Sequence, residues 1–158
     1  MNKARVWMTL GLCVIAFAAQ AKSQKGKAGL WEITSSMSMS GMPNMPSMGS
    51  HTMQVCVTQA MVDKYGGPYS NPQNGQCQTS NVVVTATGMT ANVTCTGRTN
   101  MTGTVQTTFV DANTTKTTMQ MSMSTPNGQS MTMTTQSTST YKGPDCGSVK
   151  PLAMPASQ

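Results

Sequence analysis

The segment spanning residues 114–141 constrains the fold more than any other part of the chain. Methionines alternate with polar residues on both sides of the sequence Pro126-Asn127-Gly128. A period of two gives a strand one apolar face and one polar face. Asn and Gly tolerate positive φ, so the sequence between the two runs favours a hairpin turn. The segment therefore predicts two antiparallel strands. The alternating methionines are Met119, Met121 and Met123 before the turn, and Met131 and Met133 after it.

The length of the turn decides which methionines meet. With a two-residue loop, the two methionine rows would lie on opposite faces of the hairpin. With a three-residue loop at 126–128, Met131 lies opposite Met123 and Met133 lies opposite Met121, so both rows share one buried face. We therefore predict the three-residue loop, with its glycine in the left-handed conformation as a bulge.

The rest of the chain from residue 76 onward is rich in threonine and valine, which suit a pleated, half-buried surface. Two earlier strands are expected, and Thr58 is suited to cap a short helix near residues 58–64. No connection in the strand-rich region is long enough for a parallel crossover. The sequence therefore predicts a mostly all-β fold, an antiparallel meander curled into an open barrel or half-barrel. The expected strands are 29–39, 52–57, 76–85, 90–98, 101–110, 114–125 and 129–141.

The first 21 residues have the pattern of an export signal. Lys3 and Arg5 precede an apolar run over residues 6–19, and Ala19-Gln20-Ala21 fits the small-x-small rule for cleavage. The run is shorter than the about 20 residues that a spanning helix needs, so we expect no stable membrane anchor. The sequence predicts a periplasmic or secreted protein whose mature chain starts at Lys22.

The mature chain is long enough for one domain with one modest core. We expect a flexible N-terminus over residues 22–28, a single β-rich domain over 29–147 and a flexible C-terminal tail over 148–158. The excess of basic residues is thinly spread along the chain. Because no basic patch is interleaved with aromatic residues, nucleic acid is not an expected partner.

Four of the five cysteines follow the predicted signal. An even number in a small exported chain predicts two disulfides. Neither a Cys-x-x-Cys motif nor the close paired spacings of a zinc site occur. Cys77 and Cys95 are equidistant from Ala86, so a hairpin that turns there places them opposite each other, within reach of a disulfide. This favours the pair Cys77–Cys95 and leaves the pair Cys56–Cys146.

The segment 42–53 is the strongest candidate for a metal site. It contains Met42, Met45, Met48, His51 and Met53. Soft thioethers together with an imidazole select Cu(I) or Ag(I). On a flexible loop, the spacing of the first three methionines would let their sulfur atoms converge. The alternative is that these side chains close over a methionine-rich core, because methionine fills irregular gaps.

Catalysis is not expected. The whole chain has one histidine and four carboxylates, and the sequence places no two carboxylates as an acid and a base. Serine and threonine are abundant, but abundance does not supply a base beside a nucleophile. A curled sheet lined by apolar side chains can instead hold an apolar ligand. The main hypothesis is a non-enzymatic binding module without a cofactor, for an envelope protein or an apolar ligand. The alternative is a copper- or silver-binding protein that uses the segment 42–53.

Several short motifs follow one another in a characteristic order. They are Gly29-Leu30-Trp31-Glu32-Ile33, a Met-Pro loop, Val55-Cys56-Val57-Thr58, the Cys77…Cys95 pair, Met101-Thr102-Gly103-Thr104 and Gly143-Pro144-Asp145-Cys146-Gly147. Together they resemble the domain of unknown function 3617 family of exported bacterial proteins, over about residues 29–147. The resemblance implies export, β structure and disulfides, and it implies no activity. One departure is the low aromatic content near Ser139-Thr140, where only Tyr141 is present.

Overall fold

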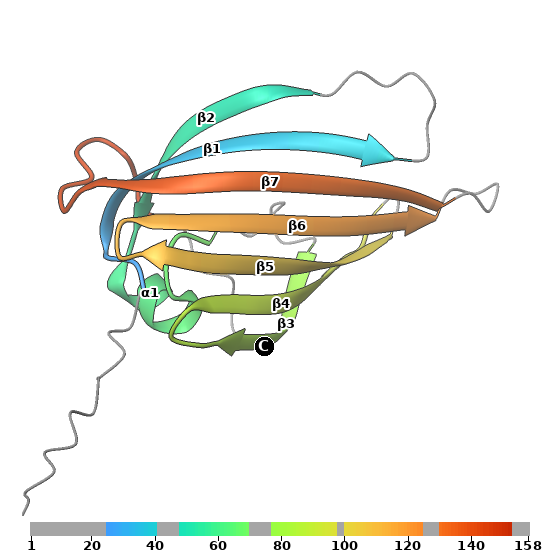
Figure 1. Ribbon diagram of the computed structural model, residues 1–158, viewed down its shortest axis with the longest axis horizontal. Coiled ribbons are helices and arrows are strands. Elements are labelled where there is room, and N and C mark those ends of the chain that lie inside the picture. The colour runs from blue at the N-terminus through green and yellow to red at the C-terminus, as the bar shows by residue number, and fades with distance from the viewer. Residues whose placement is uncertain (1–24, 41–47, 70–76, 98–99, 125–129, 153–158) are drawn as a thin grey trace, which may run out of the picture.

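The alternation of apolar and polar residues builds one curved antiparallel sheet of seven strands (Figure 1). The computed structural model describes residues 25–40, 48–69, 77–97, 100–124 and 130–152. The strand order is β2-β1-β7-β6-β5-β4-β3, and the two edges do not pair with each other. The elements are β1 (Gly29–Ser40), β2 (Met48–Val57), α1 (Gln59–Tyr65), β3 (Cys77–Val84), β4 (Gly88–Cys95), β5 (Met101–Asp111), β6 (Thr114–Ser124) and β7 (Ser130–Gly143). The predicted all-β class with an open, curled sheet and one short helix is confirmed.

The strand order departs from a simple meander at one place. Strands β3 to β7 follow one another as predicted, but β7 then pairs with β1, the first strand of the chain. Consequently β2 and β3, which are consecutive in the chain, form opposite edges of the sheet. The connection that carries α1 joins these two edges. Burial explains the added pairing, because it sets the fully buried Trp31 of β1 opposite Tyr141 of β7.

Side chains alternate between two faces of the sheet, which we call the inner and the outer face. The inner face contains the core, and α1 packs against it through Met61, Val62 and Tyr65. Thr58 caps this helix as predicted, since its side chain accepts a hydrogen bond from the backbone N–H of Met61 at 3.3 Å. The core residues of the inner face include Trp31, Ile33, Met89, Ala91, Val93, Val105, Phe109 and Met121.

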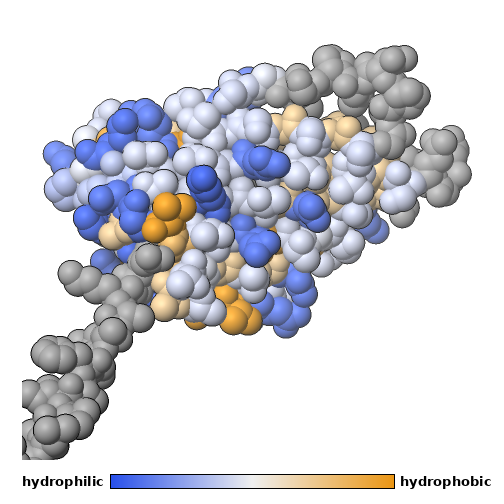
Figure 2. Space-filling model, viewed as in Figure 1, coloured by the Kyte–Doolittle hydropathy of each residue, from blue (hydrophilic) through white to orange (hydrophobic). Residues whose placement is uncertain are grey.

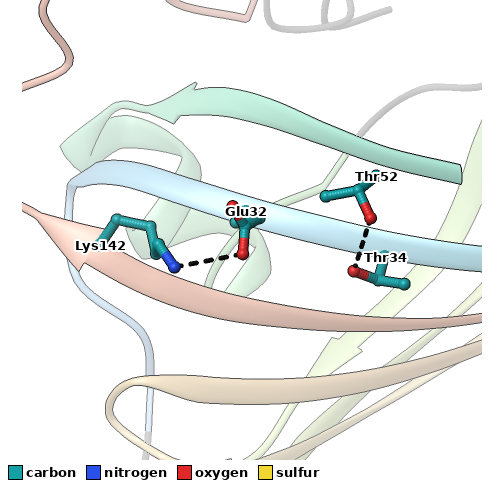
Figure 3. Close-up of polar contacts among 4 residues, drawn as sticks. All are labelled: Glu32, Thr34, Thr52 and Lys142. Atoms are coloured by element: carbon teal, nitrogen blue, oxygen red, sulfur yellow. Dashed lines mark hydrogen bonds and ion pairs between the residues drawn. The ribbon is translucent and has the colours of Figure 1, made fainter.

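The outer face is composed mainly of threonine, serine, glutamine and asparagine. Figure 3 shows two of its contacts between neighbouring strands. The hydroxyls of Thr34 on β1 and Thr52 on β2 are 3.1 Å apart, and Lys142 Nζ on β7 lies 3.2 Å from Glu32 Oε1 on β1. Figure 2 shows a largely hydrophilic surface with isolated hydrophobic patches. This surface fits a sheet that is packed on one face and solvated on the other.

The methionine hairpin has the predicted register. Met121 pairs with Met133, and Met123 pairs with Met131, so both rows lie on the inner face. The loop 126–128 and the conformation of its glycine lie outside the described residues.

Both expected disulfides are present. Cys56 is joined to Cys146 with a Cα–Cα distance of 5.5 Å, and Cys77 is joined to Cys95 with a Cα–Cα distance of 3.9 Å. The hairpin between Cys77 and Cys95 is less symmetric than predicted, because the register shifts near Asn81, which has a φ of 52°. The strand pairs next to the turn are centred just beyond Ala86. The extra residue at the bulge shifts the register of β3 back, so Cys77 still lies opposite Cys95. Two disulfides indicate an oxidising compartment.

The residues before β1 are packed against the fold. Gly26 donates its backbone N–H to the carbonyl oxygen of Gly66 at 2.7 Å. The carbonyl oxygen of Lys27 accepts a hydrogen bond from Trp31 Nε1 at 2.8 Å. Of the segment 22–28, expected to be flexible, Gly26 and Lys27 therefore make hydrogen bonds to the folded domain.

The residues after the last disulfide are held in the same way. Leu152 donates its backbone N–H to the carbonyl oxygen of Cys56 at 3.1 Å, and Pro151 forms a parallel bridge with Cys56. Of the segment 148–158, expected to be flexible, residues 151 and 152 therefore lie against β2. The predicted signal, residues 1–21, lies outside the described residues. Within the described ranges, no helix has the length and apolar character needed to cross a membrane.

Candidate functional site

The inner face divides into three zones along the strands, as the register between neighbouring strands shows. The zone near α1 is aromatic, the middle zone carries hydroxyl groups and the far zone is rich in methionine. Residues directly opposite each other on paired strands share a face, so each zone crosses several strands. The aromatic zone contains Trp31, Phe109 and Tyr141; the hydroxyl zone contains Ser35, Thr107, Thr117 and Ser137; the methionine zone contains Met39, Met101, Met119, Met121, Met123, Met131 and Met133.

The aromatic zone closes one end of the inner face. Trp31 is fully buried, and its ring meets the ring of Tyr141 edge to face, with centroids 5.5 Å apart. The hydroxyl of Tyr141 donates to the carbonyl oxygen of Ala28 at 3.3 Å. Because α1 covers this zone, no binding site is expected there.

A cavity of about 170 Å³ lies in the hydroxyl zone. It exceeds the roughly 30 Å³ of one water but is smaller than the roughly 300 Å³ of a site for a drug-sized molecule. Among the described residues that line it, none is charged. Its apolar wall consists of Ile33, Met53, Pro68, Val105 and Met119, and its hydroxyl wall consists of Ser35, Tyr69, Thr107, Thr117, Thr135, Ser137 and Ser139.

Some hydroxyl groups of this zone are paired and others are not. Thr107 Oγ1 and Thr117 Oγ1 are 2.9 Å apart, within hydrogen-bond distance. The side-chain oxygens of Thr135, which lines the cavity, and Thr115 are buried without a hydrogen-bond partner among the described residues. A buried hydroxyl without a partner costs roughly 1–3 kcal/mol. The hydroxyl wall can therefore accept a polar atom from a bound molecule.

Among the described residues that line the cavity, Tyr69 is the titratable one. Its ring stacks on that of Tyr65, with centroids 4.4 Å apart, and its hydroxyl lies 2.6 Å from Thr79 Oγ1. Burial raises the pKa of Tyr69 above its usual value near 10.0, while the hydrogen bond with Thr79 acts in the opposite direction. Tyr69 is therefore a neutral hydrogen-bonding group at physiological pH.

The raised pKa of Tyr69 predicts a change in alkaline stability. The unfolded chain ionises this phenol near pH 10, and the folded chain does so at a higher pH. The stability that the neutral phenol contributes is therefore present below about pH 10 and is lost as pH rises through the folded-state pKa. In a phenolate absorbance titration, Tyr69→Phe should lose a component that appears above pH 10. The free energy of unfolding of Tyr69→Phe should also depend less on pH above pH 10 than that of the wild-type protein. If the titration of Tyr69→Phe keeps this component, the assignment is wrong. The control is Tyr141→Phe, which leaves Tyr69 in place and should keep the component.

The residues of the candidate metal segment 42–53 are only partly within the described chain. Met42 and Met45 lie outside it. Met48, His51 and Met53 belong to β2, which begins at Met48 rather than at residue 52 as predicted. The reason is that β1 offers pairing partners as far as Met37, which lies opposite Met48. This half of the segment is thus a strand and not a flexible loop.

A bulge gives this part of β2 an unusual periodicity. On a regular strand, Met48 and His51 would face opposite sides. The register shifts between Ser35, which pairs with His51, and Met37, which pairs with Met48, so both positions belong to the inner face. His51 and Met53 are exposed along this edge, Met53 at 57%. The described residues contain no group of three or more His, Cys, Asp or Glu side chains that could hold a metal ion.

The sequence indicated a curled sheet that can hold an apolar ligand, but it did not identify the residues that line this cavity. Its signal lies in polar residues at inward positions of alternating strands, such as Ser35 on β1, Thr117 on β6 and Ser137 on β7. Each looks like an ordinary strand residue in isolation. Only the pairing of strands far apart in the sequence shows that these hydroxyls form one row.

Neither the curated proteins nor the solved structures include a significant match to this chain. Residues 26–146 match a protein family, and this match covers most of the chain. The first and last matched residues enclose all the strands and both disulfides. The chain therefore belongs to the family described as Protein of unknown function (DUF3617).

Proposed function

We propose that the protein is an exported, non-enzymatic binding module that holds a small, uncharged and mainly apolar ligand in the cavity of the inner face. The observation that supports the proposal is the lining of this cavity, which joins an apolar wall to a wall of hydroxyl groups. The two disulfides support export, because such bonds persist in oxidising compartments.

The chemistry of the lining restricts the ligand. Removing apolar surface from water favours binding by roughly 25 cal/mol per Å². A charged ligand would lose its hydration without gaining a partner, since no charged side chain is among the described lining residues. The hydroxyl of Thr135, which has no hydrogen-bond partner within the described ranges, favours a ligand with at least one hydrogen-bonding atom. A protein of the cell envelope that inserts an apolar side chain is the alternative occupant.

A substitution that fills the cavity tests this proposal. Ser35 lines the cavity, whereas Ser38 on the same strand is exposed on the outer face. We expect the wild-type protein to bind 2-naphthol, a small fluorescent probe that is uncharged at pH 7. Ser35→Phe should weaken this binding at least tenfold, because the ring occupies the same space, and Ser38→Phe should bind as wild type does. Absence of probe binding by the wild-type protein, or equal binding by both variants, would contradict the proposal.

A further inference from the structure

We infer that methionines of the inner face form a binding site for a soft monovalent cation, Cu(I) or Ag(I), beside the cavity. The site consists of the methionine cluster, which we define as Met101 on β5, Met121 and Met123 on β6, and Met131 and Met133 on β7. This inference goes beyond the proposed function, because it concerns another zone and another class of ligand. The methionine cluster is also distinct from the candidate metal segment 42–53, since all five of its residues lie on β5, β6 and β7.

The register brings the five side chains together. Met123 pairs with Met101 on one side and with Met131 on the other, and Met121 pairs with Met133. Directly opposed residues have Cβ atoms about 4.5–5.5 Å apart, and diagonal neighbours remain within reach of long side chains. Methionine has three rotatable side-chain bonds before its terminal methyl, so neighbouring sulfur atoms can converge on one point.

Gly103 fixes the position of one sulfur atom. It pairs with Met121 and lies two residues after Met101 on the same face of β5. A Cβ atom at Gly103 would lie 2.6 Å from the Sδ of Met121, and it would also overlap the carbonyl oxygen of Gln120. The absent side chain therefore leaves room for the Met121 sulfur over Gly103 of β5.

The donor chemistry of the cluster selects the ion. Thioether sulfur is a soft ligand that favours Cu(I) over Zn(II) or Cu(II). Cys56, Cys77, Cys95 and Cys146 are joined in disulfides, so none of them offers a competing thiolate. A monovalent ion also has a smaller Born desolvation cost than a divalent ion, which suits neutral ligands in a largely buried site. Met121 is 1% exposed and Met131 is 9% exposed.

The methionine cluster is only partly buried, so an ion can reach it from solvent. Met101, Met123 and Met133 are half-buried, so the cluster has both shielded and accessible sulfur atoms. A core needs only apolar volume at these positions, and leucine would supply it with better-defined side-chain conformations. A substitution by leucine therefore separates the two roles, because it keeps the volume and removes the sulfur.

The test measures Cu(I) affinity in competition with a chromogenic chelator of micromolar affinity. All proteins carry Cys13→Ser, so that a chain that retains the predicted signal offers no competing thiol. The cluster variant is Met121→Leu/Met123→Leu, and the control variant is Met61→Leu/Met89→Leu, which removes two sulfur atoms buried elsewhere. We expect the cluster variant to lose at least tenfold in affinity and the control variant to remain within twofold of the wild-type affinity. A third variant, Met42→Leu/Met45→Leu/Met48→Leu, tests the segment 42–53.

Several outcomes would overturn the inference. They are a wild-type protein that takes no Cu(I) from the chelator, an equal loss in the control variant, and a loss confined to the third variant. Should the cluster variant fail to fold, Ag(I) titration of wild-type protein labelled with ¹³C at the methionine methyl groups decides the question. Shifts of the cluster methyl signals support the site, and shifts confined to other methionines, or none, overturn it. Binding of the uncharged fluorescent probe is scored separately, so the proposed function and this inference can fail independently.

Discussion

Replacing Cys56 and Cys146 together by alanine should lower the free energy of unfolding by about 4.5 kcal/mol in the chain-entropy description. This disulfide closes a loop with a sequence separation of 90, so its removal gives the unfolded chain much more freedom. Cys77–Cys95 closes a loop with a separation of 18, and its removal should cost about 3 kcal/mol. The measurement is urea unfolding of both double variants without reductant.

The same substitution should loosen the C-terminal segment locally. The Cys56–Cys146 bond anchors the chain shortly before Leu152, whose N–H bonds to the carbonyl oxygen of Cys56. We therefore expect faster hydrogen exchange at Leu152 in the Cys56→Ala/Cys146→Ala variant and not in the Cys77→Ala/Cys95→Ala variant. A larger stability loss in the Cys77→Ala/Cys95→Ala variant would contradict the prediction that the disulfide closing the longer loop stabilises the fold more.

Local patterns explain which parts of the fold could be predicted. The register of the methionine hairpin followed from a period of two and a short turn, both of which lie within one stretch of sequence. The helix after Thr58 followed from its cap, which is also local. The pairing of Cys77 with Cys95 was correct although a bulge at Asn81 was not foreseen, because the bulge offsets the shifted turn.

Long-range pairing explains what the sequence did not reveal. No local pattern shows that β1 pairs with β7, since the two strands lie at opposite ends of the domain. The cavity depends on that pairing, because it places Ser35 opposite Ser137. For the candidate metal segment, residue types were visible in the sequence but their placement was not. The bulge that places both Met48 and His51 at inner-face positions of β2 appears only in the β1–β2 register.

Gly66→Ala should be strongly destabilising, with a loss of about 3 kcal/mol in the free energy of unfolding. Gly66 ends α1 in the left-handed conformation, with a φ of 80°, and donates its N–H to the carbonyl oxygen of Val62 at 2.8 Å. An added Cβ would overlap the ring of Phe109, which is 1% exposed and has little space to move. The left-handed backbone costs about 1–2 kcal/mol for an L-residue, and overpacking of a core adds about 1–3 kcal/mol.

Gly147→Ala separates these two causes. Gly147 also has a left-handed backbone, with a φ of 55°, but an added Cβ there meets nothing within 4 Å. Its substitution should therefore cost only the backbone strain, about 1 kcal/mol. Urea unfolding of both variants measures the difference, which isolates the contact between the helix end and the Phe109 ring. Equal losses of stability in the two variants would mean that the Phe109 ring moves aside at no cost. The end of α1 would then be packed loosely against the aromatic zone.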